Sequence, residues 1–221
     1  MLPDIDLRFR AALFDMDGTL VDSTAIIEEE WTRWALQIGK DPDEVLKIAH
    51  GRRTEEVIQA IAPDREIEKE LTHFLELAAG VDQNKVRAVE GAVQFVSLLD
   101  NAHWAVVTSA PRHIAYQRLH LAGFPEPRVL ISADDVRTGK PHPEGFTSAA
   151  LLLKMDLQDC LAFEDSPPGI LAARAAGIRV IALKTTHAQL GFGELYQIAT
   201  FADLTVIRSG SSYEAAKVAD V

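Results

Sequence analysis

The chain has 221 residues and a formal net charge of −11, with 22 basic and 33 acidic side chains. Its length suits one large domain or one domain with an insertion, and its hydrophobic share of 48% is that of an ordinary globular protein. The negative charge argues against nucleic acid and anionic membranes as partners, because clustered Lys and Arg dominate binding to both. Small phosphorylated ligands remain compatible, since a local cation or a bound metal can neutralise them.

Cysteine usage and the length of the apolar runs indicate a cytoplasmic protein. Cys160 is alone, so no internal disulfide can form, and we expect it to be a small buried side chain. Residues 1–10 show no apolar leader with a small-residue cleavage site. No apolar run approaches the roughly 18 residues that cross a bilayer. We expect no membrane partner, and a monomer or weak dimer.

The first part of the chain holds one predicted strand and then a long helical stretch. The strand is the apolar run 11–14, which ends abruptly at Asp15. From residue 23 to about 89 no strand-like run occurs, and helices are predicted at 24–38, 43–49, 54–61 and 64–79. Because this stretch is too long for one crossover helix, we expect a small helical insertion, residues 23–89, on connectors near 22–24 and 86–91. Its acidic excess indicates a solvated outer face.

From residue 100 onward, predicted strands alternate with helices. Further buried parallel strands are predicted at 104–108, 129–132, 161–164 and 179–183. One helix is predicted at 112–122, and another begins after Ser166 and ends before Gly177. This alternation predicts an α/β fold, a Rossmann-like open parallel sheet built from residues 1–22 and 90–221. The tail around 209–212 is expected to fray.

Two aspartates directly follow the first predicted strand. Asp15 and Asp17 open the segment Asp-Met-Asp-Gly-Thr-Leu-Val-Asp-Ser at 15–23. Residues two apart in an extended chain point the same way, so both carboxylates can reach the sheet edge where open α/β folds bind ligands. One can attack as a nucleophile or hold a divalent metal while the other moves protons. A bare Asp-x-Asp also fits a polar turn or a glycosyltransferase metal motif, whereas the whole nonapeptide is far more specific.

At these residues the chain resembles the haloacid dehalogenase-like superfamily, whose first motif is Asp-x-Asp-Gly-Thr/Val. The second motif of that family, a Thr or Ser that ends the next strand, matches Thr108 and Ser109 in Val-Val-Thr-Ser-Ala at 106–110. A hydroxyl beside backbone N–H groups at the start of a helix suits a phosphate, although such a threonine is by itself more often a helix cap. Together these residues are the predicted phosphate site.

The third motif of the family is a lysine, matched by Lys140 in Thr-Gly-Lys-Pro-His-Pro at 138–143. Its ammonium suits a phosphate or a neighbouring carboxylate, although a single lysine in a turn is unremarkable by itself. His142 is expected to be a packing or surface residue.

The fourth motif is acidic and matches Glu164 and Asp165. The resemblance implies a Mg²⁺ ion held by Asp15, Asp165 and the backbone carbonyl of Asp17, with Glu164 either a further ligand or a group behind the ligands.

The resemblance implies phosphoryl transfer through an aspartyl phosphate. Asp15 would attack phosphorus, and Asp17 would protonate the leaving alkoxide and then activate water. Lys140 and Thr108 would stabilise the phosphate oxygens. The dehalogenases of the superfamily lack an aspartate at the position of Asp17, which argues against dehalogenation. The relative that isomerises glucose phosphates carries a His where Ile27 aligns here, which argues against mutase activity.

The inserted helices stand where the family has a small helical cap, so we call residues 23–89 the cap. The segment His-Gly-Arg-Arg-Thr-Glu at 50–55 resembles the Gly-x-Arg-Thr segment of bacterial sugar and hexitol phosphatases and of fungal glycerol-phosphate and 2-deoxyglucose-6-phosphate phosphatases. Beside Gly51, Arg53 and Thr54 could bind a polyol or phosphate when the cap closes. Alternatively, Arg52 and Arg53 could pair with nearby acidic residues.

Trp31 and Trp34 lie three residues apart on one predicted helix of the cap. Side chains at this spacing share a helix face. We expect them in the cap core rather than as platforms that stack on a sugar.

We therefore expect a Mg²⁺-dependent phosphatase that acts on small phosphorylated sugars or polyols. The alternatives are a phosphoglycolate-type or nucleotide-type phosphatase, a phosphosugar mutase, and a non-catalytic sensor of a phosphorylated ligand. The sensor is disfavoured because Asp15, Asp17, Lys140 and Asp165 are all present, and an intact set of such groups usually signals chemistry.

Overall fold

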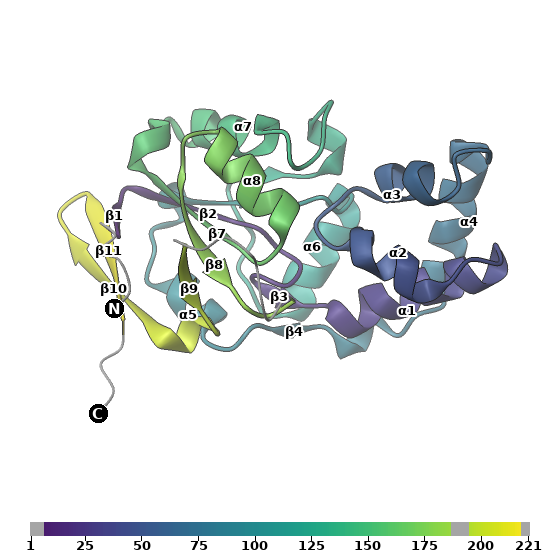
Figure 1. Ribbon diagram of the computed structural model, residues 1–221. Helices are drawn as coiled ribbons and strands as arrows, with labels where there is room; N and C mark the ends of the chain where they lie inside the picture. The colour runs from purple at the N-terminus through teal and green to yellow at the C-terminus, as the bar shows by residue number, and fades with distance from the viewer. Residues whose placement is uncertain (1–6, 187–194, 218–221) are drawn as a thin grey trace.

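A six-stranded parallel sheet forms the centre of the protein (Figure 1), which the computed structural model describes over residues 7–186 and 195–217. Residues 1–6 of the N-terminal segment considered above lie outside these ranges. In spatial order the strands are β6 (Leu130–Ile131), β5 (Trp104–Val107), β2 (Ala11–Phe14), β7 (Cys160–Glu164), β8 (Arg179–Leu183) and β9 (Tyr196–Ile198). All neighbouring pairs are parallel, which confirms the predicted open α/β sheet.

Helices cover both faces of this sheet. Successive side chains of β2 point to opposite faces, so Phe14 joins one hydrophobic cluster and Leu13 joins the other. The helices are α5 (Ala92–Ser97) and α6 (Arg112–Leu121) on the Phe14 side, and α7 (Glu144–Leu153) and α8 (Pro167–Ala175) on the Leu13 side. Ser166 caps α8 by accepting a hydrogen bond from the backbone N–H of Gly169 at 3.2 Å. Sequence patterns had predicted α6 and α8 but had not located α5 and α7.

Cys160 is buried at the start of β7 and is a free thiol, as predicted. Among the described helices, none combines the length and apolarity needed to span a bilayer.

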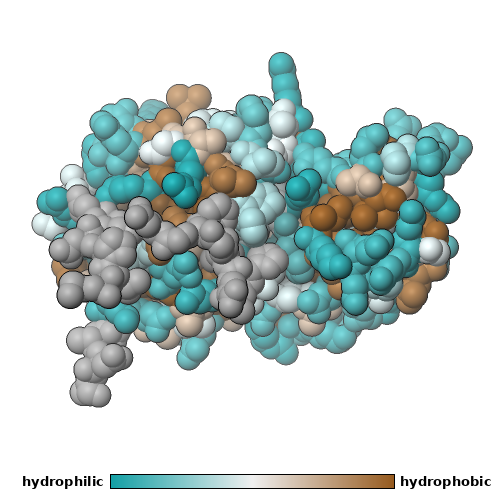
Figure 2. Space-filling model, viewed as in Figure 1, coloured by the Kyte–Doolittle hydropathy of each residue, from teal (hydrophilic) through white to brown (hydrophobic). Residues whose placement is uncertain are grey.

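The cap folds into four helices around its own hydrophobic cluster (Figure 1). They are α1 (Thr24–Gln37), α2 (Pro42–Ala49), α3 (Thr54–Ile61) and α4 (Ile67–Ala79). Trp31 and Trp34 are both buried in this cluster, as predicted, with their rings 5.5 Å apart. Helix α4 begins three residues later than predicted, because the chain first turns with a hydrogen bond from Arg65 N–H to the Ala62 carbonyl. Figure 2 shows hydrophobic side chains of the cap gathered in one patch with hydrophilic side chains around it.

The two connectors of the cap pair with each other, which corrects the prediction that residues 23–89 contain no strand. Strand β3 (Val21–Asp22) runs antiparallel to β4 (Arg87–Ala88). The pairing extends into a hydrogen bond from Val89 N–H to the Leu20 carbonyl at 2.9 Å. The strands are short and pair only because both connectors leave the core at one place, so no local sequence pattern predicts them.

The predicted fraying around 209–212 is wrong, because these residues form the tip of a β-hairpin. Strands β10 (Leu204–Ser209) and β11 (Ser212–Lys217) pair antiparallel, and β1 (Arg8–Phe9) adds to β11. Tyr213 is buried, its ring stacks on Phe9 at 5.5 Å, and its hydroxyl accepts a hydrogen bond from the Asp100 N–H. A polar, Gly- and Ser-rich turn is compatible with an anchored hairpin when the flanking side chains are buried.

Candidate active site

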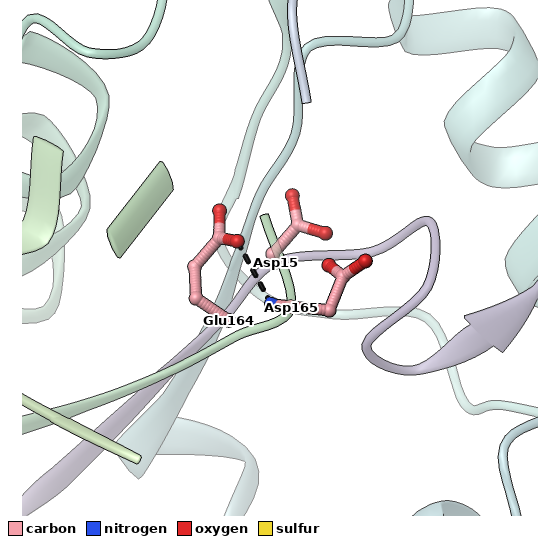
Figure 3. A group of neighbouring side chains, drawn as sticks. All are labelled: Asp15, Glu164 and Asp165. Carbon is pink, nitrogen blue, oxygen red and sulfur yellow. Dashed lines mark hydrogen bonds between the residues drawn. The ribbon is translucent and has the colours of Figure 1, made fainter. Parts of the chain in front are cut away.

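Three carboxyl groups gather where β2 and β7 end (Figure 3). Phe14 pairs with Phe163 in the parallel ladder, so Asp15, which directly follows β2, lies beside Glu164, the last residue of β7. One oxygen of each of these carboxylates and one of Asp165 lie within 4.8 Å of one another. All three residues are buried. Carboxylates from two motifs far apart in the sequence therefore form one cluster.

Lys140 lies against this cluster. Its Nζ donates hydrogen bonds to Asp15 Oδ1 and to Glu164 Oε1, the second at 2.6 Å, and its side chain is 6% exposed. Burial disfavours the charged ammonium, but the carboxylates of Asp15 and Glu164 outweigh burial and raise the pKa of Lys140. Lys140 is therefore a fixed cation next to Asp15.

The cluster holds more negative than positive charge. Asp165 receives only neutral donors among the described residues, the hydroxyl of Thr19 at 3.0 Å and the hydroxyl of Thr186. Burial, reinforced by the charge of Glu164, raises the pKa of Asp15 well above its usual value and that of Asp165 to about 7. A divalent cation would relieve this excess, and carboxylate oxygens are the ligands that Mg²⁺ prefers. The residues present therefore fit a Mg²⁺ ion.

Two glycines allow the backbone to lie against these carboxylates. A Cβ on Gly18, whose φ is +85°, would overlap Asp165, and a Cβ on Gly169 would overlap Glu164.

Glu164 is held by four donors. Besides Lys140, it accepts hydrogen bonds from the backbone N–H groups of Asp165 and Ser166, each at 2.9 Å, and from the Ser166 hydroxyl at 3.0 Å.

Asp17 lies beside the cluster and is held by other partners. Its Oδ1 accepts hydrogen bonds from the hydroxyl of Ser23 at 2.5 Å and from Nη1 of Arg118 at 2.9 Å. Arg118, on α6, also donates from Nη2 to both carboxylate oxygens of Glu30 on α1, at 3.2 and 3.3 Å. Part-buried Asp17 and buried Arg118 and Glu30 thus form an ionic chain from core to cap.

A pocket opens over these groups between the core and the cap. The core side carries Asp15, Asp17, Thr108 and Ser109. The cap side is largely apolar, with Ile27, Trp31, Phe74, Leu75 and Ala78. Asp15, Asp17, Thr108 and Ser109 therefore face one common space between core and cap, whereas Glu164, Asp165 and Lys140 are not among its lining residues.

The predicted phosphate-binding hydroxyls already make local contacts. Thr108 Oγ1 accepts a hydrogen bond from the Ala110 N–H at 3.0 Å, and the Ser109 hydroxyl donates to the Gly51 carbonyl at 2.9 Å. Thr108 thus caps the turn after β5, while Ser109 ties the core to the cap. His142 is exposed, as expected for a surface residue.

The cap segment 50–54 divides between two places. Gly51, Arg52 and Thr54 line the main pocket. Gly51 has a φ of +76°, and a Cβ there would overlap Ser166. Arg53 instead lines a second, smaller pocket that Lys140 also lines.

Arg53 fastens the cap to the core. Its guanidinium donates to the carbonyls of Val136 and Arg137 at 3.3 and 3.4 Å. Its Nε donates to Glu56 at 2.9 Å, and Glu56 also accepts from the Gly139 N–H at 3.3 Å. The arginine therefore both pairs with an acid of the cap and reaches the loop that carries Lys140.

Comparison with known proteins identifies the family. A family model described as a haloacid dehalogenase-like hydrolase matches residues 9–177. The chain belongs to this family. This match confirms the resemblance to the family that the four motifs indicated.

Two curated relatives match most of the hydrolase. It is 37% identical over 182 residues to Hexitol phosphatase A of Escherichia coli (strain K12), covering 80% of this chain and 84% of that protein. It is 35% identical over 198 residues to Glycerol-1-phosphate phosphohydrolase 2 of Saccharomyces cerevisiae, covering 82% and 77%. Among solved structures, a hydrolase from Pseudomonas syringae shares the fold, with a TM-score of 0.73, 23% identity and coverage of 84% and 88%.

Sequence motifs of the hydrolase pointed to neither Arg118 nor Glu30. A signal was nevertheless present, because both charged residues occupy apolar-stripe positions of their helices. Arg118 lies three residues after Ala115 and next to Leu119, which are both buried on α6, and Glu30 lies four residues after the buried Ile26 on α1. A charge on a buried stripe needs a partner, and that requirement could have singled out both residues.

Proposed function

We propose that this hydrolase is a Mg²⁺-dependent phosphatase of small phosphorylated sugars or polyols, with residues 23–89 acting as its cap. The observation that carries the proposal is the buried cluster of Asp15, Glu164, Asp165 and Lys140 beside a pocket that Asp17 also lines. The names of the relatives, which specify hexitol and glycerol-1-phosphate, support the substrate class.

Asp15 is the nucleophile in this proposal. One of its oxygens forms a bond to phosphorus while the ester P–O bond breaks, and Asp17 gives its proton to the departing alkoxide. Asp17 then takes a proton from a water molecule, the water oxygen bonds to phosphorus, and the bond between phosphorus and Asp15 breaks. The products are an alcohol and inorganic phosphate.

Lys140, Thr108 and Ser109 bind the phosphate oxygens in this reaction. Lys140 is a fixed cation beside Asp15, so it is placed to stabilise negative charge on the transferred group. Bound Mg²⁺, held by Asp15, Asp165 and the backbone carbonyl of Asp17, would supply further positive charge. Glu164 is better suited to holding Lys140 and the loop behind the metal, because four donors already occupy its carboxylate.

The pocket walls suit the rest of a polyol ester. Arg52 and Thr54 offer hydrogen-bonding groups, while Ile27 and Leu75 offer apolar surface to the carbon chain. In this proposal Gly51 and Thr54 contact the substrate, and Arg53 contributes by seating the same segment on the core.

The test is a panel of phosphate esters with the wild type and Asp15→Asn. We expect glycerol phosphate, a hexitol phosphate and 2-deoxyglucose 6-phosphate to be hydrolysed with Mg²⁺ and not with a chelator. Asp15→Asn should lose at least about 1,000-fold in kcat, because removal of a catalytic nucleophile has effects of that size. A thermal melt of the variant is the control for folding.

Other results would contradict the proposal. A strong preference for phosphoglycolate or a nucleotide would assign the hydrolase to that class of phosphatase. Substantial turnover by Asp15→Asn would exclude Asp15 as the nucleophile. Absence of turnover across the whole panel with Mg²⁺ would favour a non-catalytic sensor.

A further inference from the structure

Arg118 connects the proposed acid–base aspartate to the cap. It lies on core helix α6 and is 5% exposed. Its Nη1 donates to Asp17 and its Nη2 donates to Glu30, which belongs to cap helix α1. One buried guanidinium therefore bridges the loop after β2 and the cap.

Packing and stability do not account for this arrangement. Arg118 and Glu30 are buried, and the Asp17 side chain is 17% exposed. Burying an ion pair costs several kcal/mol per ion, and apolar residues of similar volume are often as stable or more so. The Nε of Arg118 and the Oε1 of Gln83 beside Glu30 are both buried without a hydrogen-bond partner in the described residues, which adds to that cost. Charged side chains that lower the stability of the fold and stand in the wall of a pocket point to a functional role.

The hydrogen bonds select one oxygen of Asp17. Both hydrogen bonds that the described residues make to this carboxylate fall on Oδ1, from Ser23 and Arg118. A carboxylate fixed through Oδ1 by two donors cannot rotate freely, and its Oδ2 is left for a different partner. Asp17 also lines the pocket, where the leaving group of a substrate would lie.

We infer that Arg118 is a positioning residue that fixes the Asp17 carboxylate through Oδ1, so that Oδ2 carries the transferred proton, and that Glu30 holds Arg118 in place from the cap. The inference rests on the proposed function, because it assigns the proton transfer to Asp17. In the first step an Asp15 oxygen bonds to phosphorus and the bond from phosphorus to the ester oxygen breaks. The proton moves from Asp17 Oδ2 to the departing ester oxygen.

The leaving group provides a test that separates positioning from general damage. An alkoxide needs a proton as it departs, whereas p-nitrophenolate leaves readily without one. The value of kcat/KM reports the steps up to the departure of the leaving group. Misplacing Asp17 should therefore lower kcat/KM for glycerol phosphate far more than for p-nitrophenyl phosphate, while damage to the fold or to phosphate binding lowers both alike.

The variants are Arg118→Met, Arg118→Lys and Glu30→Gln, measured with Mg²⁺ and both substrates. Arg118→Met should lower kcat/KM about 100-fold for glycerol phosphate and less than about 10-fold for p-nitrophenyl phosphate, since general acid catalysis contributes at least this much. Arg118→Lys should recover part of the loss, because it keeps a cation near Asp17. Glu30→Gln should lower kcat/KM less than Arg118→Met does, and its loss should again be larger for glycerol phosphate than for p-nitrophenyl phosphate.

Glu28→Gln is the matched control. It makes the same change in charge on the same helix, but Glu28 is exposed, so both substrates should retain wild-type kcat/KM. If Arg118→Met does not fold, Arg118→Lys and Glu30→Gln decide the question. Equal losses for the two substrates, or no loss for either, would overturn the inference.

Asp17→Asn separates a failure of the inference from a failure of the proposed function. If Asp17→Asn shows the loss selective for the alkyl ester and the Arg118 variants do not, Arg118 does not position Asp17, while the proposed function stands. If Asp15→Asn remains active, the proposed function itself fails.

Discussion

The core edge of the proposed active site and the cap segment 50–54 that faces it are held in different ways. At the core edge, Asp15, Lys140 and Glu164 are buried charges joined by direct hydrogen bonds. The cap segment reaches the core through hydrogen bonds of part-exposed side chains, such as those that the Arg53 guanidinium donates to two backbone carbonyls. Charges shielded from water interact strongly, whereas contacts of part-exposed side chains add little each. We therefore expect the core edge to stay fixed and the cap segment to separate from it more easily.

The largest expected effect comes from inserting a methyl group behind the core edge. Alanine in a helix is normally more stable than glycine by about 0.5–1 kcal/mol. At Gly169, however, the Cβ would overlap Glu164 and displace the carboxylate that holds Lys140. We therefore expect Gly169→Ala to lower the Tm and to reduce kcat with glycerol phosphate by about 100-fold or more, on the scale of a lost electrostatic group.

Gly177→Ala is the control for that substitution. Gly177 has a φ of +77° and open space around it, so alanine there costs about 1 kcal/mol of backbone strain. It should lower the Tm slightly and leave kcat unchanged. A fully active Gly169→Ala would show that the core edge tolerates movement, which would remove the contrast with the cap.

The next effect concerns the stability of the metal-free protein. Burial raises the pKa of Asp165 to about 7, above its ordinary value of 3.8, so the folded state holds this proton more tightly than the unfolded state. Stability is then lost as the pH rises from about 4 through about 7. In the presence of a chelator, the Tm of the wild type should fall between about pH 5 and about pH 8, and less so for Asp165→Asn.

Addition of Mg²⁺ should reverse this loss. A cation that binds the folded state at about 100 times its Kd stabilises it by about 2.7 kcal/mol. The rise in Tm should be clear for the wild type at pH 8 and small for Asp165→Asn. An equal rise in both proteins would place the ion elsewhere.

The smallest effect is expected in the cap. Arg53→Ala removes two hydrogen bonds to the core and one to Glu56, which together contribute about 1 kcal/mol because these side chains are part-exposed. KM for glycerol phosphate should rise about 3- to 10-fold, with little change in kcat or Tm. Arg33→Ala, which removes a salt bridge within α1, should leave KM unchanged. A large loss of kcat in Arg53→Ala would mean that the cap segment is as tightly coupled to chemistry as the core edge.

Much of the fold followed from local patterns. Continuous apolar runs marked β2, β5 and β7 because a parallel sheet covered on both faces buries every side chain of a strand. The β3–β4 pair and the β10–β11 hairpin escaped prediction. Their strands are short or polar, and their partners come from elsewhere in the chain, so no local period identifies them.

The candidate site residues also divide into those that local sequence indicates and those that only distant contacts bring together. Asp15 and Asp17 were predicted from their place directly after a strand, and Lys140 and Asp165 from their match to motifs of the family. Arg118 and Glu30 were missed because they lie 88 residues apart and meet only when α1 docks beside α6. For Arg53, the sequence indicated that its segment is functional but did not predict which pocket the side chain would line.

By itself, then, the sequence determined the parallel sheet, the helical cap and the charged groups at the edge of the sheet. These features depend on continuous apolar runs, on helical periodicity and on short motifs, which each segment carries locally. Only the tertiary structure decided how Asp17 is held, which of Arg52 and Arg53 lines the main pocket, and where the last strands pair. These features depend on contacts between the core and the cap or between distant strands, and their geometry exists only once both partners are folded.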